Sequence, residues 1–191
     1  MVSEYEHVPE EWITKGGFFS RRRLPTGTPV QVAATNNLML NTALIRPMGI
    51  RFDERFGISG GSDILFTRQI THRGGQLIRC DDAVVVDVVP ASRLTRQWVV
   101  RRAFRSGNGW SLTSLVLAHG WRPRLRKRLQ LTAAGGIRAL GGIARAGYGM
   151  VTRSVSQRAR GIRTLARGLG MVSGAYGLVY QEYKRKPTGM H

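Results

Sequence analysis

The stretch that decides the fold is FDERFGISGGSDILFTRQITHRGG, residues 52–75. Its first ten residues contain three glycines and predict a flexible loop. Ser62 is a suitable N-cap residue for a helix over 63–73, which Gly74 and Gly75 would end. Asp63 follows the pair Gly60-Gly61 and Ser62 directly, so it stands at the start of this helix. The stretch therefore predicts a loop that presents one carboxylate at a helix N-terminus, where the helix dipole favours a negative charge.

A second informative stretch is VVPASRLTRQWVVRRAFRSGN, residues 88–108. It predicts a helix over 94–106 that is opened by Thr95 or by the serine before it. Arginines on adjacent turns of this helix have guanidinium forks that match phosphate oxygens. A carboxylate that faces such arginines suits transfer chemistry on a phosphorylated donor, although a solvated or lipid-facing helix remains an alternative. The arginines in question are Arg101, Arg102 and Arg105.

The segments between these stretches complete an α/β pattern. Alternating side chains in PVQVAATNNLML, residues 29–40, predict a strand, and 41–49 predicts a short helix with Asn41 as N-cap. Two further strands are predicted at 76–80 and 83–89. The small polar side chains at the end of the first strand either contact a sugar hydroxyl or simply hydrogen-bond the strand end, and both interpretations stay open. These side chains are Thr35, Asn36 and Asn37.

The charge of the chain is divided unevenly between its two halves. Up to Asp87 there are ten basic and ten acidic residues, whereas from Val88 onward 20 basic residues accompany Glu182 alone. The whole net charge of +19 therefore lies in the second half. A basic segment of this kind requires anionic partners such as lipid headgroups, nucleotide phosphates or nucleic acid.

The segment 110–191 has a different character from the first 109 residues. Apolar residues at helical spacing oppose arginines at steps of seven or eight, a pattern typical of a helix that lies in a membrane interface. An ordinary amphipathic helix packed on the domain is the alternative. Abundant glycine lowers helix propensity by about 1 kcal/mol at each site, so we expect several broken helices rather than one rod. The arginines of the stripe are Arg138, Arg145, Arg153, Arg160 and Arg167.

Some classes of protein are excluded by composition. Cys80 is the single cysteine, so no intrachain disulfide forms, and one cysteine with four scattered histidines does not make a structural zinc site. The acidic N-terminus lacks the apolar core of a signal peptide. No window reaches the ~18 uncharged apolar residues of a membrane span. We therefore expect a peripheral protein at the cytoplasmic face of the cell membrane.

Taken as a set, the motifs PTGTP, ATNN, FDERFG, GG-D, VVP–RLT–W and RRAFR–GN, within about 18–108, resemble a known family. They are similar to the acceptor-side half of an inverting family 2 glycosyltransferase of the GT-A fold, of the kind that builds bacterial surface polysaccharides or glycolipids. The resemblance implies a partial GT-A (Rossmann-like) sheet in 1–109. The charge and the helical spacing described above predict a helical, basic, membrane-associating tail in 110–191. It also implies inverting transfer of a sugar from a nucleotide-sugar donor to a polysaccharide or lipid-linked acceptor.

The resemblance assigns roles to particular residues. Asp63 matches the base that removes the proton of the acceptor hydroxyl, and Ser62 stands where the family often has a further acid. Arg101, Arg102 and Arg105 match a basic segment that closes over the donor diphosphate. The remaining matches lie on the acceptor side or in the catalytic loop, and are Thr35, Asn36, Asn37, Gly60, Gly61 and Ser62.

The donor-binding part of the family pattern is missing from this chain. The family holds a divalent metal, Mg or Mn, on an Asp-x-Asp motif, which does not occur here, and no nucleotide-binding unit precedes Thr26. We therefore expect a separate chain to carry the donor-binding half, or a truncated gene product that is inactive alone. A membrane-bound scaffold subunit without catalysis is an alternative. A nucleic-acid-binding protein is disfavoured, because aromatic residues are not interleaved with the arginines.

A basic triplet, Arg21-Arg22-Arg23, precedes the first of these motifs. It is either part of a solvated loop or a basic lip on a phosphate site.

Overall fold

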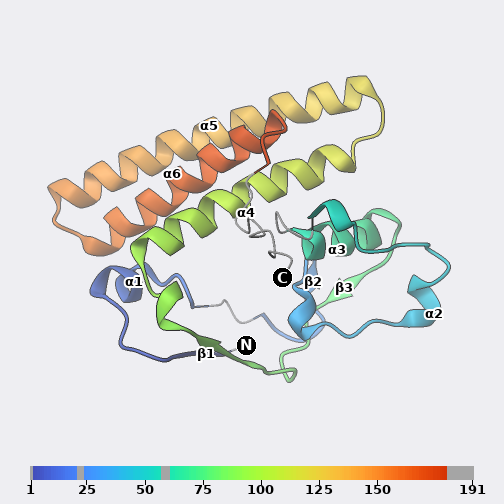
Figure 1. Ribbon diagram of the computed structural model, residues 1–191, viewed down its shortest axis with the longest axis horizontal. Coiled ribbons are helices and arrows are strands. Elements are labelled where there is room, and N and C mark those ends of the chain that lie inside the picture. The colour runs from blue at the N-terminus through green and yellow to red at the C-terminus, as the bar shows by residue number, and fades with distance from the viewer. Residues whose placement is uncertain (1, 21–23, 57–60, 180–191) are drawn as a thin grey trace, which may run out of the picture.

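The computed structural model describes residues 2–20, 24–56 and 61–179. Three long helices lie side by side in one layer, and a smaller α/β part lies against it (Figure 1). The elements in chain order are β1 Val2–Tyr5, α1 Glu11–Gly16, β2 Pro29–Val30, η1 Thr35–Asn37, α2 Thr42–Ile45, η2 Glu54–Phe56, α3 Ser62–His72, β3 Leu77–Ile78, β4 Val86–Val89, η3 Ala91–Arg93, α4 Arg96–Val116, α5 Trp121–Val151 and α6 Val155–Ala175, where η denotes a 3-10 helix.

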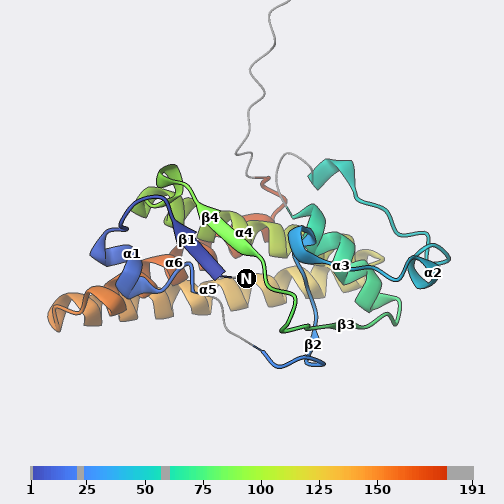
Figure 2. The ribbon, with the colours of Figure 1, turned by 90° about the horizontal axis from the view of Figure 1, so that it is seen from below.

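The described strands form two separate pairs. β1 pairs with β4 in parallel, with Val2 opposite Val86, and β2 pairs with β3 antiparallel, with Pro29 opposite Ile78 (Figure 2). The α/β class is therefore confirmed, but among the described residues there are two small sheets and not the single partial GT-A sheet that we expected.

The strand predicted over 29–40 is wrong beyond Val30, because the chain turns into the 3-10 helix η1. The backbone before η1 bonds to side chains of α3 in place of a neighbouring strand. The Ala33 amide donates to Thr67 Oγ1 at 3.4 Å, and the Thr35 amide lies 3.5 Å from Asp63 Oδ2. Tertiary contacts with α3 thus override the alternating pattern of the sequence.

Three predicted helices occur close to their predicted positions. In α2, Asn41 Oδ1 accepts from the Ala43 amide at 3.1 Å, and in α4 the Thr95 hydroxyl accepts from the Trp98 amide at 3.1 Å, so both N-cap predictions are confirmed. Ser62 is not the N-cap of α3. The chain enters α3 through Gly61 at φ 105°, a left-handed conformation that favours glycine, and Ser62 is already the first helical residue.

Helix α4 continues ten residues beyond its predicted end at Ser106 and passes through the boundary drawn at 109 and 110. The glycines there serve as packing surface. A side chain at Gly107 would lie 2.1 Å from the carbonyl oxygen of Arg167 on α6. The local helix-breaking signal of Gly107 is therefore outweighed by its close contact with α6.

The expectation that the residues after 110 do not form one rod is confirmed, because the chain leaves helical structure between α4 and α5 and again between α5 and α6, but the glycines do not break the helices themselves. α5 and α6 are unbroken, and the turn between them contains Arg153 at φ 54°. α6 lies between α4 and α5 (Figure 1). Small residues at heptad spacing line the contact between α5 and α6, and the backbones approach so closely that a Cβ at Gly142 would lie 2.4 Å from the Leu165 nitrogen. These residues are Gly135, Gly142 and Gly149 on α5 and Gly161 and Gly168 on α6.

Two clusters of buried apolar side chains form the core. One joins α1 and β4 to the long helices, and the second packs α3 against its neighbours within the α/β part. Within the described ranges, every helix is too short or too polar to cross a lipid bilayer, so that part of the expectation is confirmed. The first cluster consists of Trp12, Ile13, Val89, Leu94, Val99 and Ala159, and the second of Ile50, Phe66, Ile70 and Leu77.

Candidate active site

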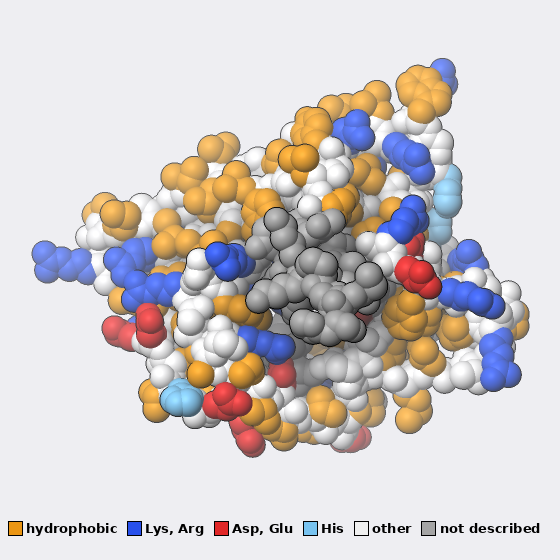
Figure 3. Space-filling model, in the orientation of Figure 1, with side chains coloured by type: hydrophobic (Ala, Val, Ile, Leu, Met, Phe, Trp, Pro, Cys, Tyr) orange, Lys and Arg blue, Asp and Glu red, His pale blue; other side chains and the backbone are white. Residues whose placement is uncertain are grey.

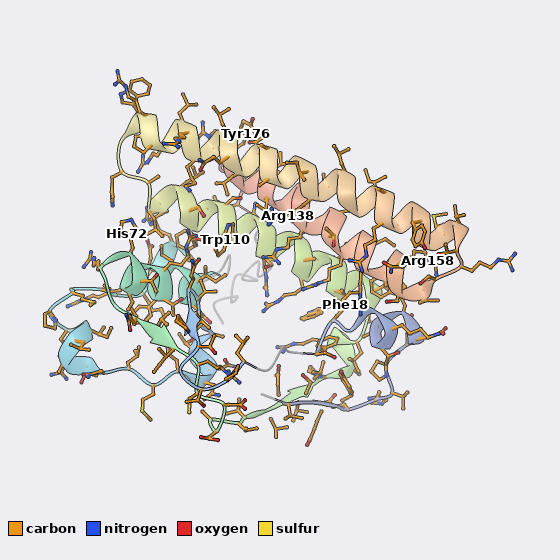
Figure 4. The ribbon with its side chains drawn as sticks, turned by 180° about the vertical axis from the view of Figure 1, so that it is seen from behind. Phe18, His72, Trp110, Arg138, Arg158 and Tyr176 are labelled. Carbon is orange, nitrogen blue, oxygen red and sulfur yellow. The ribbon has the colours of Figure 1, made fainter. Side chains whose placement is uncertain are left out.

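A cavity of about 640 Å³ lies between the α/β part and the helical layer. Its wall is built from segments that are far apart in the sequence: β1, the loop around Phe18, η1, the start of α3, β4, and the inner sides of α4 and α6. Phe18 stands on the side of the α/β part that faces the helical layer (Figure 4). The return of α6 alongside α4 adds Arg163 and Arg167 to the cavity wall.

Asp63 lies in the first turn of α3 and lines this cavity. The Ser62 hydroxyl donates to Asp63 Oδ1 at 3.2 Å, and the Thr35 amide lies 3.5 Å from Oδ2. Thr67, one turn later, donates to the Asp63 carbonyl oxygen at 2.8 Å. These contacts fix the direction of the carboxylate, and the amino end of α3 adds a favourable dipole.

Two of the three predicted arginines line the same cavity as Asp63. Arg102 and Arg105 lie on the inner side of α4, three residues apart and therefore on one helical face. Arg101 is exposed and lies outside the lining, because one residue along a helix turns the side chain by about 100°. The structure therefore brings Arg102 and Arg105 to the cavity that Asp63 also lines, and leaves Arg101 on another face.

Sequence reasoning missed the arginines that α6 contributes. Arg163 and Arg167 line the cavity from α6, which packs beside α4, and Arg93 lines it from the segment before α4. Burial lowers the pKa of Arg167, and the positive charges of Arg163 and Arg138 lower it further, although the side chain keeps an exposed surface. Regular spacing in the sequence assigned Arg167 to an arginine stripe opposite the apolar side of an amphipathic helix, and only the antiparallel return of α6 shows that it lines the cavity.

The polar residues predicted for the acceptor side are only partly brought together. Thr35 and Asn36 line the cavity, whereas Asn37 lies outside the lining and donates from Nδ2 to the Ala83 carbonyl oxygen at 2.8 Å. Gly61 supplies the left-handed entry to α3. Gly60 and the triplet Arg21-Arg22-Arg23 lie outside the described residues.

The divalent metal implied by the family resemblance has no suitable ligand set in the described residues. Two carboxylates line the cavity, those of Asp63 and Asp87. No group of three or more His, Cys, Asp or Glu side chains that could hold a metal ion occurs in the described part of the chain. Magnesium and manganese favour several oxygen ligands, so these residues do not by themselves fit such an ion.

The fold and the cavity together define a class of site. A carboxylate at a helix start lines the same cavity as several guanidinium groups, an arrangement that suits an anionic, phosphorylated ligand beside a general base. Comparison with known proteins identifies the succinoglycan biosynthesis protein ExoM of Rhizobium meliloti (strain 1021) as a distant relative, 27% identical over 176 residues. The match covers 92% of this chain and 55% of ExoM, so the chain spans about half the length of this relative. No family model matches the chain, and no solved structure matches it.

Proposed function

We propose that this chain is the acceptor-side part of a glycosyltransferase of polysaccharide biosynthesis. It would transfer a sugar from a nucleotide-sugar donor to a polysaccharide or lipid-linked acceptor, with inversion. The similarity to a succinoglycan biosynthesis protein supports the polysaccharide class. The GT-A fold, the donor and the inverting stereochemistry belong to the proposal through the family resemblance of the sequence motifs.

One observation carries the proposal: Asp63 and the pair Arg102 and Arg105 line one cavity although they come from different layers of the molecule. A carboxylate alone at a helix start is an ordinary capping group. Its juxtaposition with guanidinium groups from α4 and α6 supplies both a proton acceptor and a site for a diphosphate.

The chemistry that this arrangement supports is a direct displacement. Asp63 takes the proton of the acceptor hydroxyl while that oxygen forms a bond to the anomeric carbon of the sugar. The bond from this carbon to the diphosphate oxygen breaks on the opposite face, and its electron pair stays on the diphosphate. Arg102, Arg105 and Arg167 would stabilise the charge that develops on the leaving group. Since the described residues do not fit a metal, no step of this proposal passes through one.

In this proposal, the half of the enzyme that binds the nucleotide-sugar donor is not formed by the residues described above. A separate chain, or another part of a longer protein, would hold the nucleotide and the divalent metal that the family resemblance implies. A nucleotide-sugar and a glycan or lipid-linked acceptor are therefore the proposed small partners, and a donor-binding chain is the proposed protein partner. No nucleic-acid partner is proposed.

The test is release of nucleoside diphosphate from a panel of nucleotide-sugars in the presence of bacterial membranes that contain lipid-linked acceptors. We expect Asp63→Asn to slow the release by at least about 100-fold, as expected for loss of a general base. Asp53→Asn is the matched control, because Asp53 lies in the preceding loop, outside the cavity lining.

Binding of a nucleoside diphosphate, measured by calorimetry, separates the remaining cases. If the chain binds the nucleoside diphosphate through Arg102 but does not turn over a donor, it would be one part of a two-part enzyme. A chain that neither turns over a donor nor binds a nucleoside diphosphate would contradict the glycosyltransferase proposal and favour a scaffold subunit.

A further inference from the structure

Helix α5 has an exposed apolar face on the side that does not contact α6. The contact with α6 is made chiefly by small residues, so the large apolar side chains of α5 are left outside. Ile137 is 72% exposed, Leu140 69% and Val151 85%. Contiguous exposed apolar side chains of this extent mark an interaction site. The α5 face, as we name it, consists of Leu125, Leu129, Ile137, Leu140, Ile143, Tyr148, Met150 and Val151.

The middle of the α5 face carries little charge. Between Leu129 and Val151 the charged residues are Arg138 and Arg145. Arg138 donates to the Ala134 carbonyl oxygen at 3.3 Å, and Arg145 donates from Nε to Gln157 Oε1 on α6 at 2.7 Å. Both guanidinium groups therefore lie toward the flank of α5 that is next to α6.

Basic residues flank the α5 face at both ends. Five cations occupy the first turns of α5, and two more lie at the turn into α6 and in its first turn. Figure 3 shows apolar side chains along the upper edge, where α5 lies in Figure 1, with basic side chains at both of its ends. The flanking cations are Arg122, Arg124, Arg126, Lys127 and Arg128 at one end, and Arg153 and Arg158 at the other.

We propose that the α5 face docks onto the surface of an anionic lipid bilayer, with α5 lying parallel to the membrane plane. Its apolar section, 129–151, is about 33 Å long at ~1.5 Å per residue. An interfacial helix of this kind buries an apolar face among the acyl chains, while arginine and lysine side chains reach the phosphates. Anionic headgroups supply the negative charge that the surrounding protein surface lacks, since 88–179 contains no Asp or Glu.

A second copy of the chain is a poorer occupant for this face. Two symmetric α5 faces would bring their cationic ends together or against another basic surface, with no acid in either helix to compensate. The cavity wall contains no residue of α5. Membrane docking is therefore independent of the proposed transferase chemistry, and it leaves the cavity uncovered by lipid.

The experiment is flotation of the chain with vesicles of phosphatidylcholine that contain one third phosphatidylglycerol, compared with pure phosphatidylcholine. We expect binding to the anionic vesicles and a loss of at least about tenfold in the double variant Leu140→Gln/Ile143→Gln, because two apolar side chains no longer leave water. Met39→Gln/Leu44→Gln is the matched control, since both side chains are exposed and lie in the α/β part. Unchanged circular dichroism of both variants verifies folding.

A second readout reports insertion directly. Cys80 is the only cysteine, so Cys80→Ser/Ile137→Cys carries one environment-sensitive fluorophore on the α5 face. Its emission should shift to the blue on anionic vesicles, whereas the same label in Cys80→Ser/Met39→Cys should not respond.

Three outcomes would overturn the proposal. The first is equal binding of the native chain and of Leu140→Gln/Ile143→Gln, which would place lipid binding elsewhere on the basic surface. The second is no response of the label at residue 137. The third is absence of vesicle binding together with a dimer, seen by sedimentation, that the double variant abolishes, because the α5 face would then be an interface between copies.

Discussion

The arginine side chains at the cavity wall should bind a phosphorylated anion. Burial lowers the pKa of Arg167, and the nearby positive charges of Arg163 and Arg138 lower it further, so a bound anion would relieve both effects. Inorganic pyrophosphate should therefore stabilise the folded chain, by about 1.4 kcal/mol at ten times its dissociation constant. The melting temperature would rise by about 3–6 °C for a chain of this length. Differential scanning fluorimetry with and without pyrophosphate measures the shift.

Two neighbouring arginines provide the matched control for pyrophosphate binding. Arg102→Gln should weaken binding by about tenfold or more, because a charge-assisted hydrogen bond is worth about 1.5–3 kcal/mol. Arg101→Gln removes the same charge from an exposed position outside the cavity lining and should bind nearly as the native chain does. Equal weakening by both substitutions would mean that pyrophosphate responds only to the overall charge of the helical layer.

In the loop that precedes Asp63, an ion pair should make the stability of the chain depend on pH. Arg55 donates from Nη2 to Asp53 Oδ2 at 2.6 Å, which lowers the pKa of Asp53 below its ordinary 3.8. A lowered carboxyl pKa contributes stability above the ordinary value, and that contribution is lost as the pH falls through the lowered pKa. Asp53→Asn should therefore destabilise the chain at neutral pH, by less than about 1 kcal/mol because the partner side chain of Arg55 is 75% exposed and solvent screens the ion pair.

Urea unfolding at neutral pH and below 3.8 tests this assignment for Asp53. The difference between the native chain and Asp53→Asn should shrink in acid. A difference that stays constant or grows there would show that the Arg55 contact does not control the carboxyl group.

At the scale of the elements, the contact between α5 and α6 depends on glycine at particular positions. An alanine Cβ at 142 would lie 2.4 Å from the Leu165 nitrogen and 2.9 Å from the Gly161 carbonyl oxygen, both in the backbone of α6. The two helices would have to move apart, so Gly142→Ala should destabilise the chain by about 2 kcal/mol or more. Chemical unfolding followed by circular dichroism measures this loss.

The adjacent glycine is the control for this substitution. A Cβ at Gly141 meets no atom within 4 Å, so Gly141→Ala should stabilise α5 by up to about 1 kcal/mol through helix propensity alone. A loss of stability in Gly142→Ala together with a gain in Gly141→Ala would separate the effect of close packing from that of helix propensity. Two substitutions of the same sign would show that α5 and α6 do not approach as closely as described.

The sequence predicted the helix starts correctly where they depend on hydrogen bonds between residues close together in the chain. The caps at Asn41 and Thr95 bond to amides two and three residues away, within the reach of sequence reasoning. Gly107 and Gly142 were misleading because glycine signals helix breaking locally, whereas here it permits contact with a helix distant in the sequence. Arg167 was assigned to another surface for the same reason, since only the path of α6 places it at the cavity.

At the scale of the whole molecule, Arg68 joins the α/β part to the helical layer. From α3 it donates to Thr113 Oγ1 at 3.0 Å and to Ser114 Oγ at 2.9 Å, and its guanidinium group lies 4.3 Å from the ring centroid of Trp110 on α4. Burial lowers its pKa, but the hydrogen bonds and the ring compensate the charge. Because α3 also carries Asp63, this contact fixes the carboxylate relative to the arginines of α4.

Replacing Arg68 should loosen α3 without melting the helical layer. Arg68→Met keeps much of the volume but loses both hydrogen bonds, at a cost of about 1–3 kcal/mol. Thr113 and Ser114 still donate to carbonyl oxygens of their own helix, so α4 should stay intact. Hydrogen exchange should therefore accelerate at the α3 amides and remain unchanged in α6, with Arg73→Met, at an exposed position after α3, as the control. Equal acceleration in α3 and α6 would mean that the two layers open as one unit, and that Asp63 is held by the whole packed interface and not by Arg68.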